Sequence, residues 1–285
     1  MARDRRTPAR EVRDLREGGH VPRKSLGQNF LVDPNILRKI ASSAEVGPGE
    51  RVVEIGSGPG TLTELLAERA AEVISVEIDR ELLEAQRERL RERKNVRFVP
   101  GDFLEFDLEG AAAGGSLVVV GNIPYHATSP ILDRVLEASA AARVDRAVFL
   151  VQKEVAARLA ANPGTKDFGR LTLAVRYRAE VEVLFKVGPA AFRPRPRVDS
   201  AVIRLRFHHP PAVRAADERA LFELARVLFS GRRKMIRTGL RAARSLTPEE
   251  IAAVEERSGV NLSARPEELD VDDWCRLSDA VGEIR

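Results

Sequence analysis

The chain contains 285 residues, of which 44% are apolar and 32% charged, a composition typical of a globular protein with a substantial core. The single cysteine, Cys275, excludes an internal disulfide framework, and four scattered histidines predict no metal site. The sequence has no run of about 18 apolar residues and no apolar stretch of a signal peptide, so it predicts a cytoplasmic protein with no membrane partner.

The net charge of +4 is distributed unevenly along the chain. Residues 186–246 contain 15 basic and 4 acidic side chains, whereas residues 247–285 contain 4 basic and 11 acidic ones. Such segregation creates a local positive field, which is the electrostatic footprint of a polyanion partner. A solvated basic face without a partner is the alternative interpretation.

Strand and helix signals alternate through the first half of the chain, after an arginine-rich arm at residues 1–22. Predicted strands cover residues 51–55, 72–78, 96–99, 117–120 and 147–151. Predicted helices cover residues 34–43, 62–70, 81–93, 129–139 and 153–161. This alternation predicts an α/β fold with a doubly wound, Rossmann-like parallel sheet.

The pattern changes after Asn162. A predicted helix ending near residue 179 is followed by two β-rich runs, 181–187 and 201–207, which we expect at an edge of the sheet. Residues 208–211 indicate a linker, and only helical signals follow, at 217–230, 234–243, 248–258 and 271–282. We therefore predict a basic arm at 1–22, a core domain at 23–207 and a small all-helical C-terminal domain at 212–285.

Three signals for a nucleoside ligand follow the first three predicted strands. The glycines of residues 56–60 allow close approach of a ligand to the backbone, but Thr61 stands where the dinucleotide fingerprint needs glycine. Glu77, 21 residues after Gly56, has the spacing of an acid that accepts hydrogen bonds from ribose hydroxyls, and Asp102 could accept from an adenine amino group. Together they favour S-adenosylmethionine over a nicotinamide cofactor. A tight structural turn and a solvated helix-start carboxylate are the alternatives.

The most informative stretch is Asn122-Ile123-Pro124-Tyr125, at the end of a fully apolar predicted strand. Ligands of open α/β sheets lie outside the carboxyl ends of the strands. A carboxamide can hold an amino group and a tyrosine face can hold a flat base. The stretch therefore predicts chemistry on the exocyclic nitrogen of a nucleobase.

From about residue 23 to about residue 280, the chain resembles the ribosomal RNA adenine dimethyltransferases. The motifs that carry the resemblance are residues 28–31, 54–60, 77, 102, 122–125, 151–155, 191–202 and 232–237. The resemblance implies a methyltransferase fold and transfer of methyl groups from S-adenosylmethionine to N6 of adenine. The chain looks most like the small-subunit branch, which dimethylates two adjacent adenines in the 3′-terminal hairpin loop of 16S rRNA.

The resemblance also implies the site residues. It places Gln28, Asn29, Leu31, Gly56, Gly58, Glu77, Asp102 and Asn122 around the cofactor, and Asn122, Pro124, Tyr125 and Phe192 at the target base. The implied partner is small-subunit rRNA in a 30S assembly particle, bound by a monomer. His126 and Ala127 depart from the commonest residues of the family motif.

The residues suggest how such a site would work. We expect the Asn122 side-chain oxygen and a backbone carbonyl of Ile123 or Pro124 to accept the two amino protons, with His126 as a rival general base. Tyr125 and Phe192 would stack on opposite faces of the base, although a core position is the alternative for Phe192. The expected RNA-binding residues are Arg193, Arg195, Arg197, Arg232, Arg233, Lys234 and Arg237.

Two other functions stay open. One is the erythromycin-resistance type of enzyme, which methylates a single large-subunit adenine. The other is a non-catalytic assembly or transcription factor on the same fold, against which the intact Gly56, Glu77, Asp102 and Asn122 count.

Overall fold

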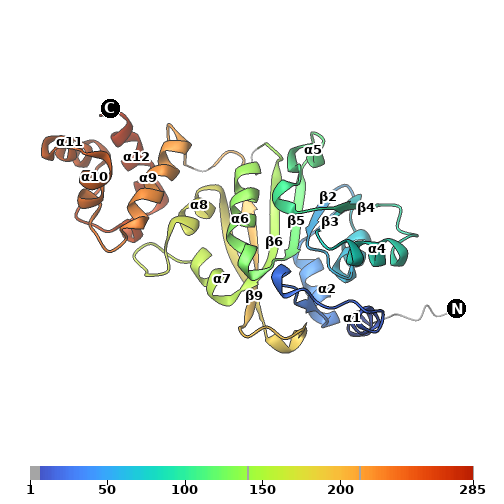
Figure 1. The fold of residues 1–285 in the computed structure, drawn as a ribbon. Helices are drawn as coiled ribbons and strands as arrows, with labels where there is room; N and C mark the ends of the chain where they lie inside the picture. The colour runs from blue at the N-terminus through green and yellow to red at the C-terminus, as the bar shows by residue number, and fades with distance from the viewer. Residues whose placement is uncertain (1–6, 140, 212, 285) are drawn as a thin grey trace. The chain divides into compact units, whose positions relative to one another are not determined.

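The computed structural model describes residues 7–139, 141–211 and 213–284 (Figure 1). The chain forms two compact units. The first comprises Met1–Ala156 and Glu182–Phe207, and the second comprises Ala157–Val181 and His208–Arg285. The sequence predicts one continuous core domain at residues 23–207. The structure instead groups residues 157–181 with the C-terminal helices, because Phe168, Leu173 and Tyr177 are buried in the same apolar cluster as those helices.

The first unit is built on a seven-stranded sheet. In spatial order the strands are β4 (Val96–Pro100), β3 (Glu72–Glu77), β2 (Arg51–Ile55), β5 (Leu117–Asn122), β6 (Val144–Gln152), β9 (Ser200–Phe207) and β7 (Ala179–Val187). The first five are parallel, and β9 runs antiparallel to β6. The predicted doubly wound sheet and its late β-rich edge are therefore confirmed.

Alternate strand residues bury one face of this sheet. Val52, Val73, Val118 and Val148 share an apolar cluster with α2 (Pro34–Ser43) and α3 (Thr61–Ala67). Since side chains alternate along a strand, the intervening residues point to the other face. This unit also contains α4 (Arg80–Arg89), α5 (Leu108–Ala112), α6 (Thr128–Ala138) and the start of α7 (Lys153–Leu159), and α6 contacts β6.

The N-terminal arm contains a helix that the sequence analysis did not predict, α1 (Pro8–Glu17). Its Val12 is buried in a small cluster with Phe30 and Leu82. Arg89 of α4 pairs with Glu11 of this helix at 2.9 Å and donates to the Pro59 carbonyl at 2.9 Å. Because of the high arginine content, this amphipathic helix was not predicted. It packs beside the glycine-rich turn.

The second unit is helical. It contains α8 (Arg170–Arg178), α9 (Glu218–Ser230), α10 (Ile236–Arg244), α11 (Pro248–Ser258) and α12 (Val271–Gly282). Its core is centred on the buried Trp274, whose ring stacks on that of Phe229 with 5.3 Å between the ring centroids. The four predicted C-terminal helices are confirmed within two residues at each end. None of the described helices has the length and apolar character needed to span a bilayer.

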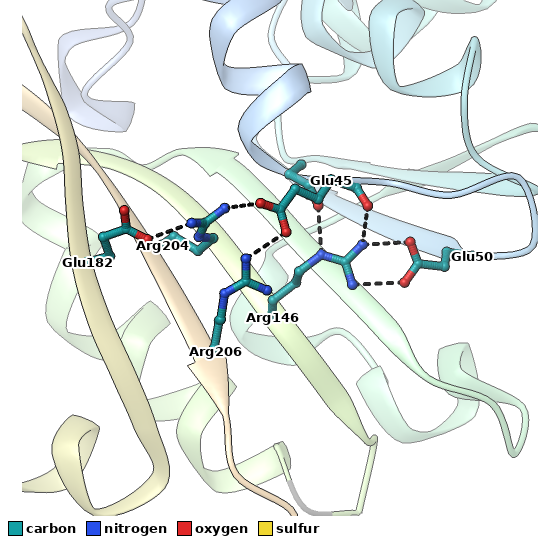
Figure 2. A network of polar contacts seen from close by, with 7 residues as sticks. Glu45, Glu50, Arg146, Glu182, Arg204 and Arg206 are labelled. Atoms are coloured by element: carbon teal, nitrogen blue, oxygen red, sulfur yellow. Dashed lines mark hydrogen bonds and ion pairs between the residues drawn. The ribbon is translucent and has the colours of Figure 1, made fainter.

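A buried arginine joins four parts of the first unit at the end of the sheet opposite the carboxyl ends of the parallel strands (Figure 2). Arg146, near the start of β6, donates to Glu50 through both terminal nitrogens, at 2.8 and 2.6 Å, and to the carbonyls of Ala44 and Glu45 at 2.7 Å each. The Glu45 carboxylate in turn binds Arg204 and Arg206 of β9. The Arg146 guanidinium holds the pKa of Glu50 below its usual range.

We predict that Arg146→Ala lowers the free energy of unfolding by about 2–3 kcal/mol, because two carbonyls lose their Arg146 donor and the Glu50 carboxylate keeps only the Gly47 backbone nitrogen. Chemical denaturation at neutral pH measures this change. Arg91→Ala is the matched control, since Arg91 forms an exposed pair with Glu88 at 3.0 Å and its loss should have almost no effect. Equal stability of the two variants would contradict the structural role of Arg146.

A second buried charge-bearing group lies in β2. Glu54 is 2% exposed, and its Oε2 has no hydrogen-bond partner among the described residues. Burial raises the pKa of Glu54 to about 8, helped by the nearby Glu77 carboxylate and opposed by Thr63 and Arg89. The group is therefore protonated in the folded protein at neutral pH.

This pKa has a definite consequence for stability. As the pH rises from about 4.5 to about 8, the unfolded chain releases the Glu54 proton before the folded chain does, so the free energy of unfolding falls. Glu54→Gln should make this decline of the unfolding free energy with pH shallower. Some slope should remain because burial also raises the pKa of Glu77. Denaturation at pH 5 and pH 8 measures it. The exposed Glu88→Gln should retain the wild-type slope, and an unchanged slope in Glu54→Gln would refute the prediction.

Candidate active site

The turn between β2 and α3 provides a backbone cradle. Gly56, Gly58 and Gly60 have φ values of +62°, +56° and +78°, which side chains other than glycine rarely adopt. A Cβ on Gly58 would lie 3.2 Å from the Phe30 ring, whereas Gly56 has open space on that side. The turn therefore presents bare backbone at Gly56, as the sequence predicts for a ligand-binding loop.

Buried polar side chains hold this turn in place by hydrogen bonds. Gln86 donates to the Gly58 carbonyl at 2.6 Å and to Ser57 Oγ at 2.9 Å. Ser75 of β3 bonds to Ser57 Oγ at 2.7 Å and to Gln86 Oε1 at 2.9 Å. These residues were not predicted from the sequence, although a serine inside an otherwise apolar strand was an available signal.

Glu77 ends β3 and faces the turn. It is 4% exposed and accepts hydrogen bonds from the backbone nitrogens of Gly58 at 2.8 Å and Asp79 at 2.9 Å. Burial raises its pKa, while these two backbone donors act in the opposite direction. The carboxylate thus lies beside the exposed Gly56 backbone, and its role as the ribose acceptor stays a prediction.

A loop before β1 (Phe30–Leu31) covers the same site. Gln28 donates to the buried Asp79 carboxylate at 2.9 Å. Gly27 has a φ of +64°, and a Cβ there would lie 2.9 Å from His126 Nδ1. This loop and the segment after β5 are thus in close contact.

Asn122 is the last residue of β5. Its Nδ2 donates to the Asn29 carbonyl at 2.9 Å, which fixes the orientation of the carboxamide. With the nitrogen committed to Asn29, the side-chain oxygen is the group left to accept a hydrogen bond from a ligand. Asn122 and Asn29 are 93 residues apart in sequence, and only the fold brings them together.

Tyr125 lies just beyond Asn122 and is held at its hydroxyl. Its OH and the Oγ of the buried Ser200 are 2.6 Å apart, and either oxygen can be the donor. Burial raises the pKa of Tyr125, with the Ser200 hydrogen bond acting against it. The phenol is therefore neutral over the physiological range.

These side chains line one cavity of about 80 Å³. Its lining includes the predicted site residues Gln28, Asn29, Gly56, Gly58, Glu77, Asn122, Pro124 and Tyr125. The volume is below the roughly 300–1,000 Å³ typical of small-molecule sites. A nucleoside-sized ligand therefore requires displacement of a covering segment.

Phe192 corrects one of the expectations. It lies in β8 (Phe192–Arg193), opposite Leu31 in the β1–β8 pair, and its side chain is 0% exposed within the apolar cluster of the sheet. The ring cannot stack on a base in this arrangement. The core alternative holds for Phe192, and Leu31 is likewise a buried core residue at 5% exposure.

Asp102 is exposed but does not line the Asn122 cavity. Its Oδ1 accepts from the Leu104 backbone nitrogen at 2.9 Å, and it belongs to a separate cavity of about 440 Å³ with Val76, Gly101 and Phe106. Two apolar residues that the sequence analysis missed accompany the strand-end acids. Ile78 follows Glu77 and is 47% exposed, and Leu104 is 37% exposed. An apolar residue one or two positions after a strand-end acid was the available sequence signal.

The predicted cationic residues are all exposed, but they lie in two parts of the chain. Arg193, Arg195 and Arg197 occupy the segment between β8 and β9 in the first unit. Arg232, Arg233 and Lys234 form the turn between α9 and α10 in the second unit, and Arg237 is in the first turn of α10. The first three of this second group thus precede the helix rather than start it.

The structure brings together three side chains of metal-ligand type that the sequence left scattered. Ligand atoms of His20, Asp79 and Glu81 lie within 4.8 Å of one another. The Arg23 guanidinium is 3.6 Å from Asp79 and 3.3 Å from Glu81, and His20 Nδ1 is 3.0 Å from Glu81. The cluster is thus an ion-pair network in which arginine supplies the positive charge.

The chain is similar to known proteins over nearly its full length. The ribosomal RNA adenine dimethylase family matches residues 19–282. A ribosomal RNA small subunit methyltransferase A from Moorella thermoacetica is 45% identical, over 95% of this chain and 96% of the relative. The protein of that name from Geobacillus kaustophilus is 41% identical, over 100% and 99%.

Two solved structures share the fold over most of the chain. A dimethyladenosine transferase from Plasmodium falciparum has a TM-score of 0.73 at 25% identity, covering 86% of this chain and 94% of that one. The 23S rRNA methyltransferase ErmE has a TM-score of 0.69 at 33% identity, covering 89% and 100%. By sequence over nearly its full length, the chain belongs to the ribosomal RNA adenine dimethylase family.

Proposed function

We propose that this protein transfers methyl groups from S-adenosylmethionine to N6 of two adjacent adenines in the 3′-terminal hairpin loop of 16S rRNA, giving N6,N6-dimethyladenosine. The observation that carries the proposal is the fixed carboxamide of Asn122 at the carboxyl end of β5, beside Tyr125 and the bare glycine turn. The curated relatives named as small-subunit methyltransferases support the choice of rRNA.

The cofactor site that we propose centres on Glu77 and the Gly56–Gly58 backbone. Glu77 would accept from the ribose hydroxyls, exchanging its present backbone donors for them, and the exposed Ile78 would pack on the adenine ring. Asp102 would accept from the adenine amino group. Because the cavity is small, we infer that Gln28 and its loop move outward when the cofactor enters.

The target amino group would be held by two acceptors. The first is Asn122 Oδ1, which its Asn29 contact leaves available. For the second we assign the Ile123 carbonyl, because the Pro124 carbonyl already accepts from the Ala127 nitrogen at 2.9 Å and from Thr128 Oγ1 at 3.3 Å. Pro124 instead shapes the turn.

These contacts prepare the nitrogen for reaction. Two acceptors in fixed positions draw the amino group toward tetrahedral geometry, so that its lone pair is no longer delocalised into the ring. S-adenosylmethionine, when bound, supplies the electrophilic methyl group. No side chain needs to remove a proton beforehand, since the nitrogen becomes strongly acidic once methylated. Tyr125 would stack on the base, a contact that contributes about 1–3 kcal/mol.

The exposed cations provide the RNA contacts in this proposal. Arg193, Arg195 and Arg197 would bind phosphates beside the site, and Arg232, Arg233, Lys234 and Arg237 would bind a helical part of the rRNA. We place the reaction in the cytoplasm on a 30S assembly particle and propose that a monomer carries it out. The likeness to ErmE favours large-subunit RNA as the second candidate substrate.

Labelled S-adenosylmethionine, the protein and small-subunit particles from an unmethylated strain test the proposal together. We expect label in two adjacent adenines of 16S rRNA. Asn122→Ala should lower the rate at least about 100-fold, because the lone pair is no longer oriented, while calorimetry should detect cofactor binding largely retained. Asn35→Ala, on the exposed part of α2, is the control and should retain full activity.

The alternative results separate the other functions. Label in large-subunit particles only would replace the proposal with the resistance-type reaction. Cofactor binding without label in either particle would favour an assembly factor. Near-wild-type turnover by Asn122→Ala would exclude the proposed role of its carboxamide.

The second unit should contribute binding that depends on salt. We predict that Arg232→Ala combined with Arg233→Ala reduces the slope of log affinity against log salt concentration by about one to two, because each phosphate contact contributes about 0.7–0.9. Filter binding to small-subunit particles over a salt series measures this slope. Arg257→Ala is the control, since Arg257 is exposed on α11 and pairs with Glu283 at 3.3 Å. If the double variant and the wild-type protein had equal slopes, the turn between α9 and α10 would not be part of the RNA interface.

A further inference from the structure

Ser200 is the buried partner of the tyrosine at the target base. It is the first residue of β9 and lies opposite Gln152 in the β6–β9 pair. Its side chain is 0% exposed, so its position is set by the sheet rather than by solvent. Tyr125, by contrast, is half-buried in a short 3₁₀ turn. The 2.6 Å contact between their oxygens therefore anchors a ring on a turn to a rigid strand.

The anchor acts at the far end of the ring. A tyrosine side chain turns about two torsions: χ1 moves the hydroxyl the furthest, whereas χ2 turns the ring about the line from Cβ to the hydroxyl oxygen. Fixing the hydroxyl while the backbone fixes Cβ therefore fixes the position and direction of this ring axis. The same ring lines the cavity that contains Asn122 and Pro124. The Tyr125–Ser200 bond thus sets the surface on which a base would stack.

The two methyl transfers make different demands on that surface. In each transfer the N6 lone pair forms the new nitrogen–carbon bond, the sulfur–carbon bond breaks with its electron pair kept by sulfur, and one N6 proton passes to water. Unmethylated adenine offers two N–H groups to Asn122 and Ile123, but monomethylated adenine offers one. In the second transfer, less of the base's orientation comes from hydrogen bonds and more from stacking.

We propose that Ser200 is a positioning residue that, through the hydroxyl of Tyr125, enables the second methyl transfer and so determines that the product is dimethylated. This inference rests on the proposed function. It assigns to Ser200 a part in product outcome rather than in cofactor binding, since Ser200 does not line the cavity of the cofactor site.

The test measures both products in adenines of unmethylated small-subunit particles by mass spectrometry of the nucleosides, at saturating S-adenosylmethionine. Ser200→Ala and Tyr125→Phe should each raise the ratio of monomethyl to dimethyl product about threefold to tenfold, as expected for loss of one buried hydrogen bond. The KM for S-adenosylmethionine should change little, and in both variants the second transfer should slow more than the first. The double variant should match either single variant, because all three lack the same bond.

Ser139→Ala is the matched control. Ser139 is also a buried serine of the first unit with one hydrogen bond, to the Leu136 carbonyl at 2.8 Å, but it lies at the end of α6. It should show the wild-type product ratio. Tyr125→Phe changes a half-buried position, so it tests the bond even where Ser200→Ala folds poorly.

A wild-type product ratio in Tyr125→Phe, or additive effects in the double variant, would overturn the role of Ser200. A wild-type protein that methylates no adenine would instead refute the proposed function.

Discussion

The reversal of strand order between β2 and β5 is the constraint on which the site depends. Because β3 and β4 extend the sheet on one side of this pair and β6 extends it on the other, the segments that follow β2 and β5 diverge and leave a crevice at the carboxyl ends. The glycine turn enters this crevice from β2, and Asn122 enters it from β5. The cavity that they share follows from topology before any side chain is considered.

Polar groups from distant parts of the chain then give the crevice its geometry. Asn29 orients the Asn122 carboxamide, Ser200 anchors Tyr125, and Gln86 holds the turn at Gly58. Each of these contacts is between partners at least 28 residues apart. A buried polar group without a partner is costly, so the contacts stabilise the fold and orient the site at the same time.

Charged groups are arranged differently at the two ends of the parallel strands. Away from the strands' carboxyl ends, the Arg146 guanidinium donates four hydrogen bonds, two to backbone carbonyls and two to the Glu50 carboxylate (Figure 2). Near the site, Glu54 is buried and protonated, and Glu77 retains an orientation that suits a ligand. The first arrangement links segments of the first unit to one another, while in the second Glu77 alone of the two acids lines the candidate cofactor cavity.

From the sequence alone we could predict the strand–helix alternation of the sheet domain, the four C-terminal helices and the positions of Gly56, Glu77 and Asn122 at strand ends. These features depend on periodicity and local turn chemistry, which act over a few residues. The folded chain was needed to show that Phe192 is a core residue, that α1 packs beside the glycine turn, that residues 157–181 join the helical unit and that Ser200 holds Tyr125. Burial and pairing depend on which distant residues meet, and a single sequence does not specify those contacts locally.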